Sequence, residues 1–417
     1  MKIFETFAGI GAQHKALKNL KEEGIVKDFE AVGISEWYIS AIIAYSLIHH
    51  NKDFQNQLKE IEKKYGLNEV DPKVLKKNEK EFKEYVLKEL EEETFSTNSK
   101  DPANLSRVNT TTLKQLYVGR KVTKNLGSVM GVVGEELPKG IDVLTYSFPC
   151  QDLSAAGKKR GLERGTRSGL LWEIGRIINE TPIENRPNVL LMENVPTLFN
   201  KFAEGWNVWK EELKQLGYVS YDITLNSKEF NMAQHRRRAF SIALKVDQFK
   251  EEELENFDIE KAIENTKTYT KYQKEIDKNG YAKIKDILDT NIPPRYYINK
   301  PFNILKSTDG STGVKFDLID HSSYEIANRI YDTNFGSPTL TTSGQIKIYD
   351  DEEKKKLRAI KENEAFKLMG FDQKDFDLVE KNFTKGHLYR FAGNSIAVNV
   401  LEGLFEVING LLEQRKK

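Results

Sequence analysis

The only cysteine of this 417-residue chain lies where it could act as a nucleophile. The segment Ser147-Phe148-Pro149-Cys150-Gln151 follows an apolar run, Ile141 to Tyr146, that predicts a buried strand. Pro149 fixes its own φ and keeps Phe148 out of helical space, so the chain should leave the strand in an irregular loop. A lone cysteine there is a candidate nucleophile, although most free cysteines are simply small buried side chains.

Carboxyl groups follow two other predicted strands. Glu193 comes after the run Val189 to Met192, and a carboxyl near a thiol suits acid–base chemistry. Glu36 follows the run Ala31 to Ser35, where an acid can accept hydrogen bonds from ribose hydroxyls, and Trp37 can cover an adenine face. The alternatives are helix caps or ion-paired acids, and a core tryptophan.

Basic side chains occur in two clusters. Gln234 to Arg238 precedes the predicted strand Phe240 to Leu244, and strand alternation places Arg236 and Arg238 on one side. Guanidinium groups there can bind a phosphate or a base oxygen, whereas a solvated surface run is the alternative. A second cluster combines basic residues with glycines, which suits a loop that closes over a polyanion, or an ordinary exposed loop. It contains Lys158, Lys159, Arg160, Arg164 and Arg167.

A glycine turn near the start of the chain joins a predicted strand, Lys2 to Phe7, to a predicted helix, Ala12 to Glu22. Gly9 and Gly11 let the backbone approach a ligand closely, and the helix start favours a negative group. The third glycine of a dinucleotide fingerprint is missing, and a plain tight turn is the alternative.

The elements that carry these residues alternate between strands and helices. A further helix is predicted over Ile39 to His49, and the pattern indicates a parallel α/β sheet with ligands at the carboxyl ends of its strands. With 39% hydrophobic and 30% charged residues, we see no apolar stretch long enough to cross a bilayer. A single cysteine excludes an intramolecular disulfide, and we expect a cytoplasmic protein. The net charge of +1 does not exclude nucleic-acid binding, because a basic groove can exist within a neutral total.

We expect a first domain over residues 1–245, with a Lys- and Glu-rich insertion of solvated helices at about 52–130. The composition becomes less regular after it, which predicts a second, smaller domain and hinge over 246–391. Residues 392–417 should return to the first domain through a helix over Ala397 to Leu412.

In content and order these segments resemble the bacterial DNA cytosine-5 methyltransferases over nearly the whole chain. One motif can match by chance, but six or seven in the same order do not. The resemblance implies an α/β, Rossmann-like S-adenosylmethionine-dependent methyltransferase domain with a smaller, irregular target-recognition domain. The matching segments are Phe7-Ala8-Gly9-Ile10-Gly11, Pro149-Cys150-Gln151, Thr166-Arg167-Ser168-Gly169-Leu170, Glu193-Asn194-Val195, Gln234 to Arg238, Thr339-Leu340 and Gly393-Asn394-Ser395-Ile396.

The resemblance implies that the Cys150 thiolate adds to carbon 6 of a flipped cytosine and Glu193 assists at ring N3. Arg238 would donate to the cytosine O2, with Arg236 supporting the loop. The implied cofactor is S-adenosyl-L-methionine, which yields S-adenosyl-L-homocysteine, and no metal is implied. The cofactor-binding residues would be Phe7, Gly9, Ile10, Gly11, Glu36, Trp37, Ser128, Val129, Pro149, Leu170, Asn394 and Ser395. The DNA-binding residues would be Gln151, Ser154, Lys158, Arg160, Arg167, Gln234, Thr339 and Leu340.

Two positions depart from the family pattern. Ser128 stands where the family usually has an acid that contacts the cofactor adenine, which predicts weaker or rearranged adenine binding. Glu362 replaces a usual proline in a segment containing Arg358, Ile360 and Glu364, and we expect that segment to be structural.

The implied partner is double-stranded DNA, with a restriction endonuclease as a functional partner outside any stable complex, a monomeric chain and no membrane. Three alternatives stay open: a transfer-RNA cytosine-5 methyltransferase of the same fold, a nicotinamide-dependent oxidoreductase, and a binding module without catalysis. The oxidoreductase does not explain Cys150, Glu193 and the arginines together. The intact Cys150 and Glu193 argue against the binding module.

Overall fold

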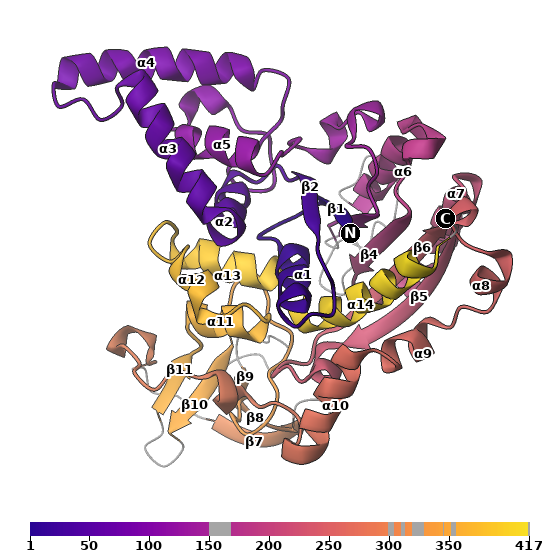
Figure 1. Cartoon of the computed structure of the whole chain (residues 1–417). Helices are drawn as coiled ribbons and strands as arrows, with labels where there is room; N and C mark the ends of the chain where they lie inside the picture. Colours follow the sequence, from indigo (N-terminus) through magenta and orange to yellow (C-terminus); the bar gives the residue numbers. More distant parts are fainter. Residues whose placement is uncertain are drawn as a thin grey trace.

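The computed structural model describes residues 1–149, 168–298, 304–309, 313–318, 329–344, 346–351 and 356–415. Its first part is built on a six-stranded sheet in the order β2-β1-β3-β4-β6-β5 (Figure 1). The strands are β1 (Lys2–Thr6), β2 (Glu30–Ser35), β3 (Val143–Tyr146), β4 (Val189–Asn194), β5 (Tyr218–Asn226) and β6 (Arg237–Lys245).

Strands β1 to β4 are parallel, as the sequence predicts, but β6 is antiparallel to both β4 and β5. The expectation of a wholly parallel sheet was therefore wrong at β6. The reversal matters because the first residues of β6 lie at the same sheet edge as the last residues of β3 and β4. Beyond β2, pairing is reduced to a single bridge between Ile34 and Asn125.

Helices cover both faces of this sheet because successive strand residues point to opposite sides. On β1, Ile3 belongs to a hydrophobic cluster with α1 (Ala12–Glu22), α2 (Ile39–His49), α5 (Thr110–Val122) and α14 (Val398–Gln414). Phe4 belongs to the opposite cluster, with α6 (Leu171–Glu180) and α7 (Ala203–Gln215). The predicted helices 12–22 and 39–49 are confirmed, and α2 is buried at nine of its eleven positions.

The C-terminal stretch Lys385–Gln414 is long and apolar enough to span a bilayer by composition, contrary to our sequence-based statement. In the fold, 67% of the most apolar 18-residue part of this stretch is buried, and α14 packs along α1. The apolar character of α14 is therefore that of a core helix.

The charged insertion forms a helical lobe that projects from the sheet (Figure 1). Its helices α3 (Asn51–Tyr65) and α4 (Pro72–Glu89) bury one narrow stripe each, with Phe54 and Leu58 on α3 and Phe82 and Val86 on α4. Helix α5, also within the predicted insertion, instead packs on α2 and belongs to the core. The solvated part therefore ends before α5.

The second sheet has the order β11-β10-β9-β8-β7. The helices before it, α8 (Glu251–Glu255), α9 (Ile259–Glu264) and α10 (Lys267–Asn279), were expected in the second domain. However, α9 packs on β5 and α14, and α10 packs on α14. We therefore draw the boundary near residue 280 rather than at 246. The strands are β7 (Ile304–Asp309), β8 (Gly313–Leu318), β9 (Arg329–Tyr331), β10 (Lys347–Asp351) and β11 (Lys356–Ala359).

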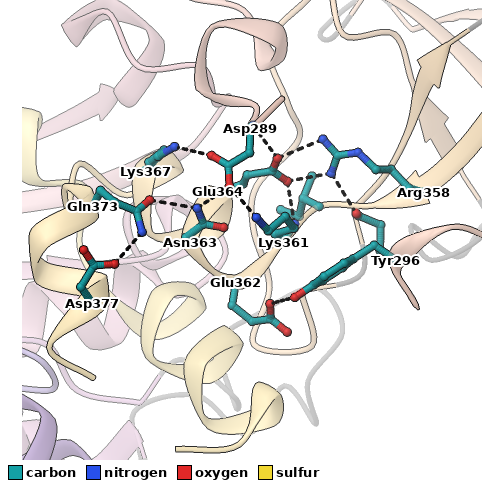
Figure 2. A network of polar contacts seen from close by, with 12 residues as sticks. Asp289, Tyr296, Arg358, Lys361, Glu362, Asn363, Glu364, Lys367, Gln373 and Asp377 are labelled. Carbon is teal, nitrogen blue, oxygen red and sulfur yellow. Dashed lines mark hydrogen bonds and ion pairs between the residues drawn. The ribbon is translucent and has the colours of Figure 1, made fainter. Parts of the chain in front are cut away.

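Helix α11 (Glu362–Leu368) precedes α12 (Gln373–Asp377) and α13 (Lys385–Asn394), and a buried polar network anchors it to the second sheet (Figure 2). The Arg358 guanidinium donates to both carboxylate oxygens of Glu364 at 2.8 and 2.9 Å, and both side chains are fully buried. Glu364 also accepts from the backbone N–H groups of Lys361 and Asp289 at 2.6 and 2.9 Å. Glu362, in place of the usual proline, accepts from the Tyr296 hydroxyl.

A second buried network lies beneath the glycine turn. The Tyr45 hydroxyl donates to Glu5 at 2.7 Å and contacts His14 Nδ1 at 3.1 Å. Burial raises the pKa of Glu5 to about 8, so this carboxyl is largely protonated at neutral pH. Gly11 has φ +78°, and a β-carbon there would lie 2.5 Å from His49 Nε2, so only glycine fits above this network.

Breaking the Arg358–Glu364 pair should destabilise the protein strongly. Because Arg358→Met leaves a fully buried carboxylate without its cation, we expect a loss of about 3–5 kcal/mol in the free energy of unfolding. Urea denaturation measures the loss. Lys77→Met, which removes an exposed pair with Glu81, is the control and should cost less than about 1 kcal/mol. Equal, small losses in both variants would contradict the assignment.

Glu5 should make stability depend on pH. Its pKa is raised in the folded state, so its stabilising contribution is complete below its ordinary pKa and is lost as pH rises from about 4.5 to about 8. The amide that Glu5→Gln introduces stays neutral at every pH. The free energy of unfolding of this variant should therefore rise relative to that of the wild type by up to about 1.4 kcal/mol per pH unit across this range. Denaturation at pH 5.5, 6.5 and 7.5 tests this, with exposed Glu92→Gln as control. Parallel curves for wild type and Glu5→Gln would refute it.

Candidate active site

The carboxyl edge of the first sheet brings together most of the residues that the sequence singled out. The Phe7–Gly11 turn follows β1, Glu36 follows β2, and Ser147–Pro149 follows β3. Glu193 lies near the end of β4, and Arg238 lies at the start of antiparallel β6. In the register of the sheet Glu193 pairs with Phe240, which places it two residues from Arg238 on the neighbouring strand.

Glu193 is only 8% exposed, and two neighbours orient its carboxylate. The Ser147 hydroxyl donates to Glu193 Oε2 at 2.7 Å, and Arg238 Nε lies 3.1 Å from Oε1. Each oxygen has a partner from a different strand end, so the carboxyl plane is fixed relative to the segment after β3. A carboxyl held in this way can exchange a proton with a bound base.

Asn194 fixes the segment that leads to the cysteine. Its side-chain Nδ2 donates to the carbonyl of Phe148 at 3.0 Å, and its Oδ1 accepts from the Val195 N–H at 2.8 Å. Pro149 is the last described residue of this segment. The predicted residues Cys150, Gln151, Ser154, Lys158, Arg160 and Arg167 lie outside the described residues.

Glu36 closes the other end of the site by accepting from backbone N–H groups. Gly9 donates to Oε2 at 2.9 Å, and Trp37 and Tyr38 donate to Oε1 at 2.9 and 2.8 Å. Burial raises the pKa of Glu36, and the three N–H donors oppose that rise. Oε2, with one donor, keeps acceptor capacity for a ligand hydroxyl.

The backbone of the glycine turn is open to a ligand at Gly9. A β-carbon at Gly9 would meet no atom within 4 Å, so a ligand can approach the backbone there. Phe7 has φ +53°, a strained conformation for an aromatic residue of the kind that occurs at functional sites. Phe7, Trp37, Pro149 and Leu170 are half-buried, and Asn394 is exposed.

Three predicted cofactor residues have buried side chains. Ile10 and Val129 are 2% and 5% exposed and belong to the two hydrophobic clusters, so contact with a ligand is limited to their backbones. Ser395 is 8% exposed, and its carbonyl accepts from Arg236 at 2.8 Å. A role of these three residues in cofactor binding stays a prediction, and it would have to be met by their backbone groups.

Arg236 and Gln234 differ from Arg238 in what they bind. Arg236 is 4% exposed, and its guanidinium donates to the carbonyls of Leu340, Gly393 and Ser395 at 3.1, 3.0 and 2.8 Å. Arg238 instead pairs with Glu193, so the two arginines have different partners, and the Arg236 guanidinium lies at the joint between the two parts of the chain.

Gln234 is fully buried, donates to the Leu368 carbonyl at 3.0 Å, and accepts from the Leu340 N–H at 2.8 Å. Leu340 is itself 1% exposed. Both were predicted to bind DNA, but the structure uses them as internal contacts. Thr339 is half-buried, and its hydroxyl donates to the His235 carbonyl at 2.8 Å.

Sequence reasoning missed two residues of the site, Ser147 and Asn125. Asn125 Oδ1 accepts from the N–H groups of Glu36 and Gly127, each at 3.0 Å, and its Nδ2 donates to the Glu36 carbonyl at 2.9 Å. The sequence could have indicated Asn125, because this asparagine stands two residues before Gly127 in the segment that carries Ser128 and Val129. Ser147 stood in the quoted cysteine segment, but nothing local indicated its bond to Glu193. Across the part of the chain that the structure describes, no group of three or more His, Cys, Asp or Glu could hold a metal ion.

Comparisons with known proteins agree with this geometry. The family model described as C-5 cytosine-specific DNA methylase matches residues 104–410. Orphan methyltransferase M.SssI of Spiroplasma monobiae is 34% identical over 98% of this chain and 97% of its own length. Type II methyltransferase M2.ScrFI of Lactococcus lactis subsp. cremoris is 28% identical over 97% of this chain and 98% of its own length. The crystal structure of S. pombe Dnmt2 methyltransferase superposes with a TM-score of 0.60 at 17% identity, covering 98% of both chains, which shows a shared fold.

Proposed function

The chain belongs to the C-5 cytosine-specific DNA methylases, and we propose that it methylates carbon 5 of a cytosine flipped out of duplex DNA. The observation that supports the site assignment is the carboxyl of Glu193, held by Ser147 and Arg238 beside the segment that leads to Cys150. The Cys150 thiolate would add to carbon 6, because C5 is a poor nucleophile until the ring is activated. A cytosine inside the stack cannot be reached, so the base must be flipped.

The side chains around Glu193 would divide the work at the pyrimidine ring. Glu193 would hold a proton at ring N3 and stabilise the charge that develops as the thiolate adds. Arg238 would donate to the cytosine O2, while its Nε keeps the Glu193 carboxyl in plane. Arg236 acts at a distance, by fixing the backbone from which Arg238 projects.

The family uses S-adenosylmethionine, which supplies an electrophilic methyl group at its sulfonium sulfur. Glu36 Oε2 would accept from a ribose hydroxyl, and the open space at Gly9 would admit the ligand against the backbone. Phe7, Trp37, Pro149, Leu170 and the exposed Asn394 would surround it. Loss of the carbon 5 proton and elimination of Cys150 from carbon 6 would then restore the aromatic base and free the enzyme, with S-adenosylhomocysteine as the second product.

DNA would lie between the two sheets. Residues from about 280 to 357 would read base edges in the major groove, with Thr339 near a phosphate of the target. The basic residues Lys158, Arg160 and Arg167 would contact the DNA backbone. We place the protein in the bacterial cytoplasm as a monomer, functionally paired with a restriction endonuclease without a stable complex. The transfer-RNA alternative has less support, because the matching family model describes DNA methylases.

Replacing the nucleophile should abolish methyl transfer. We expect Cys150→Ser to lower the rate by about a thousandfold or more, because a serine hydroxyl is far less nucleophilic than a thiolate. Bisulfite sequencing of DNA from a methylation-deficient bacterial host that expresses the protein would reveal both reaction and target. Calorimetry should give the same Kd for S-adenosylhomocysteine in both proteins. Retained turnover would exclude the nucleophile assignment, and methylation of transfer RNA alone would favour the alternative.

Ser147 should act as a positioning residue for Glu193. Ser147→Ala removes one donor to the carboxylate, worth about 1–1.5 kcal/mol, so kcat should fall about tenfold while KM for DNA stays unchanged. Ser46→Ala, which removes a buried hydroxyl bond within α2, is the matched control and should leave both kcat and KM unchanged. An unchanged kcat in Ser147→Ala, or a fall in kcat matched by a rise in KM for DNA, would refute this role.

A further inference from the structure

The exit of the helical lobe is built into the edge of the proposed cofactor site. After α4, Ser96 N–H donates to the Trp37 carbonyl at 2.7 Å, and the Ile39 N–H donates to the Ser96 carbonyl at 2.9 Å. Ser96 forms a parallel bridge with Tyr38 between these bonds. The segment 93–96 therefore runs directly beside the turn that carries Glu36.

Glu93 in this segment has a carboxylate oxygen that lacks a hydrogen-bond partner. Its side chain is 15% exposed, and Arg120 of α5 pairs with Oε1. Oε2 is buried and accepts no hydrogen bond from any residue that the structure describes. A buried acceptor without a donor is costly, commonly about 1–3 kcal/mol and more for a charged group, so Oε2 is suited to receive one from a ligand.

That oxygen lies against the position next to Ser128. A β-carbon at Gly127 would be 3.6 Å from Glu93 Oε2 and 3.5 Å from the Thr94 carbonyl. Gly127 has φ +70°, and its N–H donates to Asn125, the residue that also binds Glu36 through backbone bonds. Glu93 therefore lies beside Gly127, and Glu36 is joined to the same Asn125–Gly127 segment through Asn125.

We propose that Glu93 accepts a hydrogen bond from the 6-amino group of the cofactor adenine, an inference that rests on the proposed methyl-donor site. A carboxylate only accepts, and the exocyclic amine is the donor on the base edge of an adenosine whose ribose is held by Glu36. Ser128 Oγ is a neutral hydroxyl that already accepts from the Met130 N–H at 3.4 Å. The inserted lobe thus supplies the acid that the core of the fold lacks at Ser128.

Ligand pairs differing only at position 6 of the purine test this assignment. S-adenosylhomocysteine carries an amino donor there, whereas S-inosylhomocysteine carries a carbonyl oxygen that would face the carboxylate. Titration calorimetry on the full chain should show wild type preferring the adenosyl ligand by about tenfold or more. In Glu93→Gln, whose amide can donate to a carbonyl, that preference should fall about tenfold or reverse.

Two further variants separate recognition from loosening of the lobe. Glu62→Gln removes the other carboxylate that pairs the lobe with α5, through Lys114, and should leave the ligand preference at its wild-type value. Glu93→Asp keeps the negative charge on a side chain one methylene shorter, so the carboxylate should lie farther from the ligand. This variant should lose part of the preference for S-adenosylhomocysteine. An unchanged preference in both Glu93 variants, with wild type still binding S-adenosylhomocysteine, would overturn the role of Glu93 alone. Failure of wild type to bind either ligand would overturn the methyl-donor site itself.

Discussion

One buried cation, the guanidinium of Arg236, connects the first sheet to two later parts of the chain. It donates to the carbonyl of the turn at Leu340 and to those of the C-terminal segment at Gly393 and Ser395. A cation 96% removed from solvent must have such acceptors, because desolvation otherwise costs several kcal/mol. The start of β6, the turn at Leu340 and the C-terminal segment are therefore fixed together, and this also fixes the backbone of Arg238, two residues later.

Backbone groups also set the chemistry of the acidic side chains. Within the described ranges, the Glu36 carboxylate accepts only from backbone N–H groups, and the Asn125 side chain binds the Glu36 backbone. Glu193 instead accepts from two side chains, those of Ser147 and Arg238. The first arrangement is rigid and suits binding, whereas the second can exchange a proton or lose a partner to substrate. One sheet edge thus carries two carboxyl groups in environments suited to different tasks.

The charged lobe is connected to the sheet edge by a short segment that pairs with Tyr38. Its outer helices each bury only a narrow apolar stripe, as expected for the solvated helices that the sequence predicts. The segment that leads from α4 back to the core pairs with Tyr38 through Ser96. This pairing brings the Glu93 carboxylate, which is not part of the sheet, next to Gly127. Because the lobe and the turn after Glu36 share this short segment, changes in the lobe can displace the turn without altering the sheet.

Local patterns in the sequence determined the parallel strands, α1, α2 and the order of the residues at the sheet edge. These patterns suffice because apolar periodicity and glycine turns act over a few residues. The sequence did not reveal β5, whose middle positions are half-buried and carry no clear pattern, nor the reversal of β6. It also placed Gln234 on DNA, whereas its amide binds Leu340, 106 residues away. Only tertiary packing could decide the partners of Gln234, Arg236 and Glu93, because each depends on backbone or side-chain groups from a distant part of the chain.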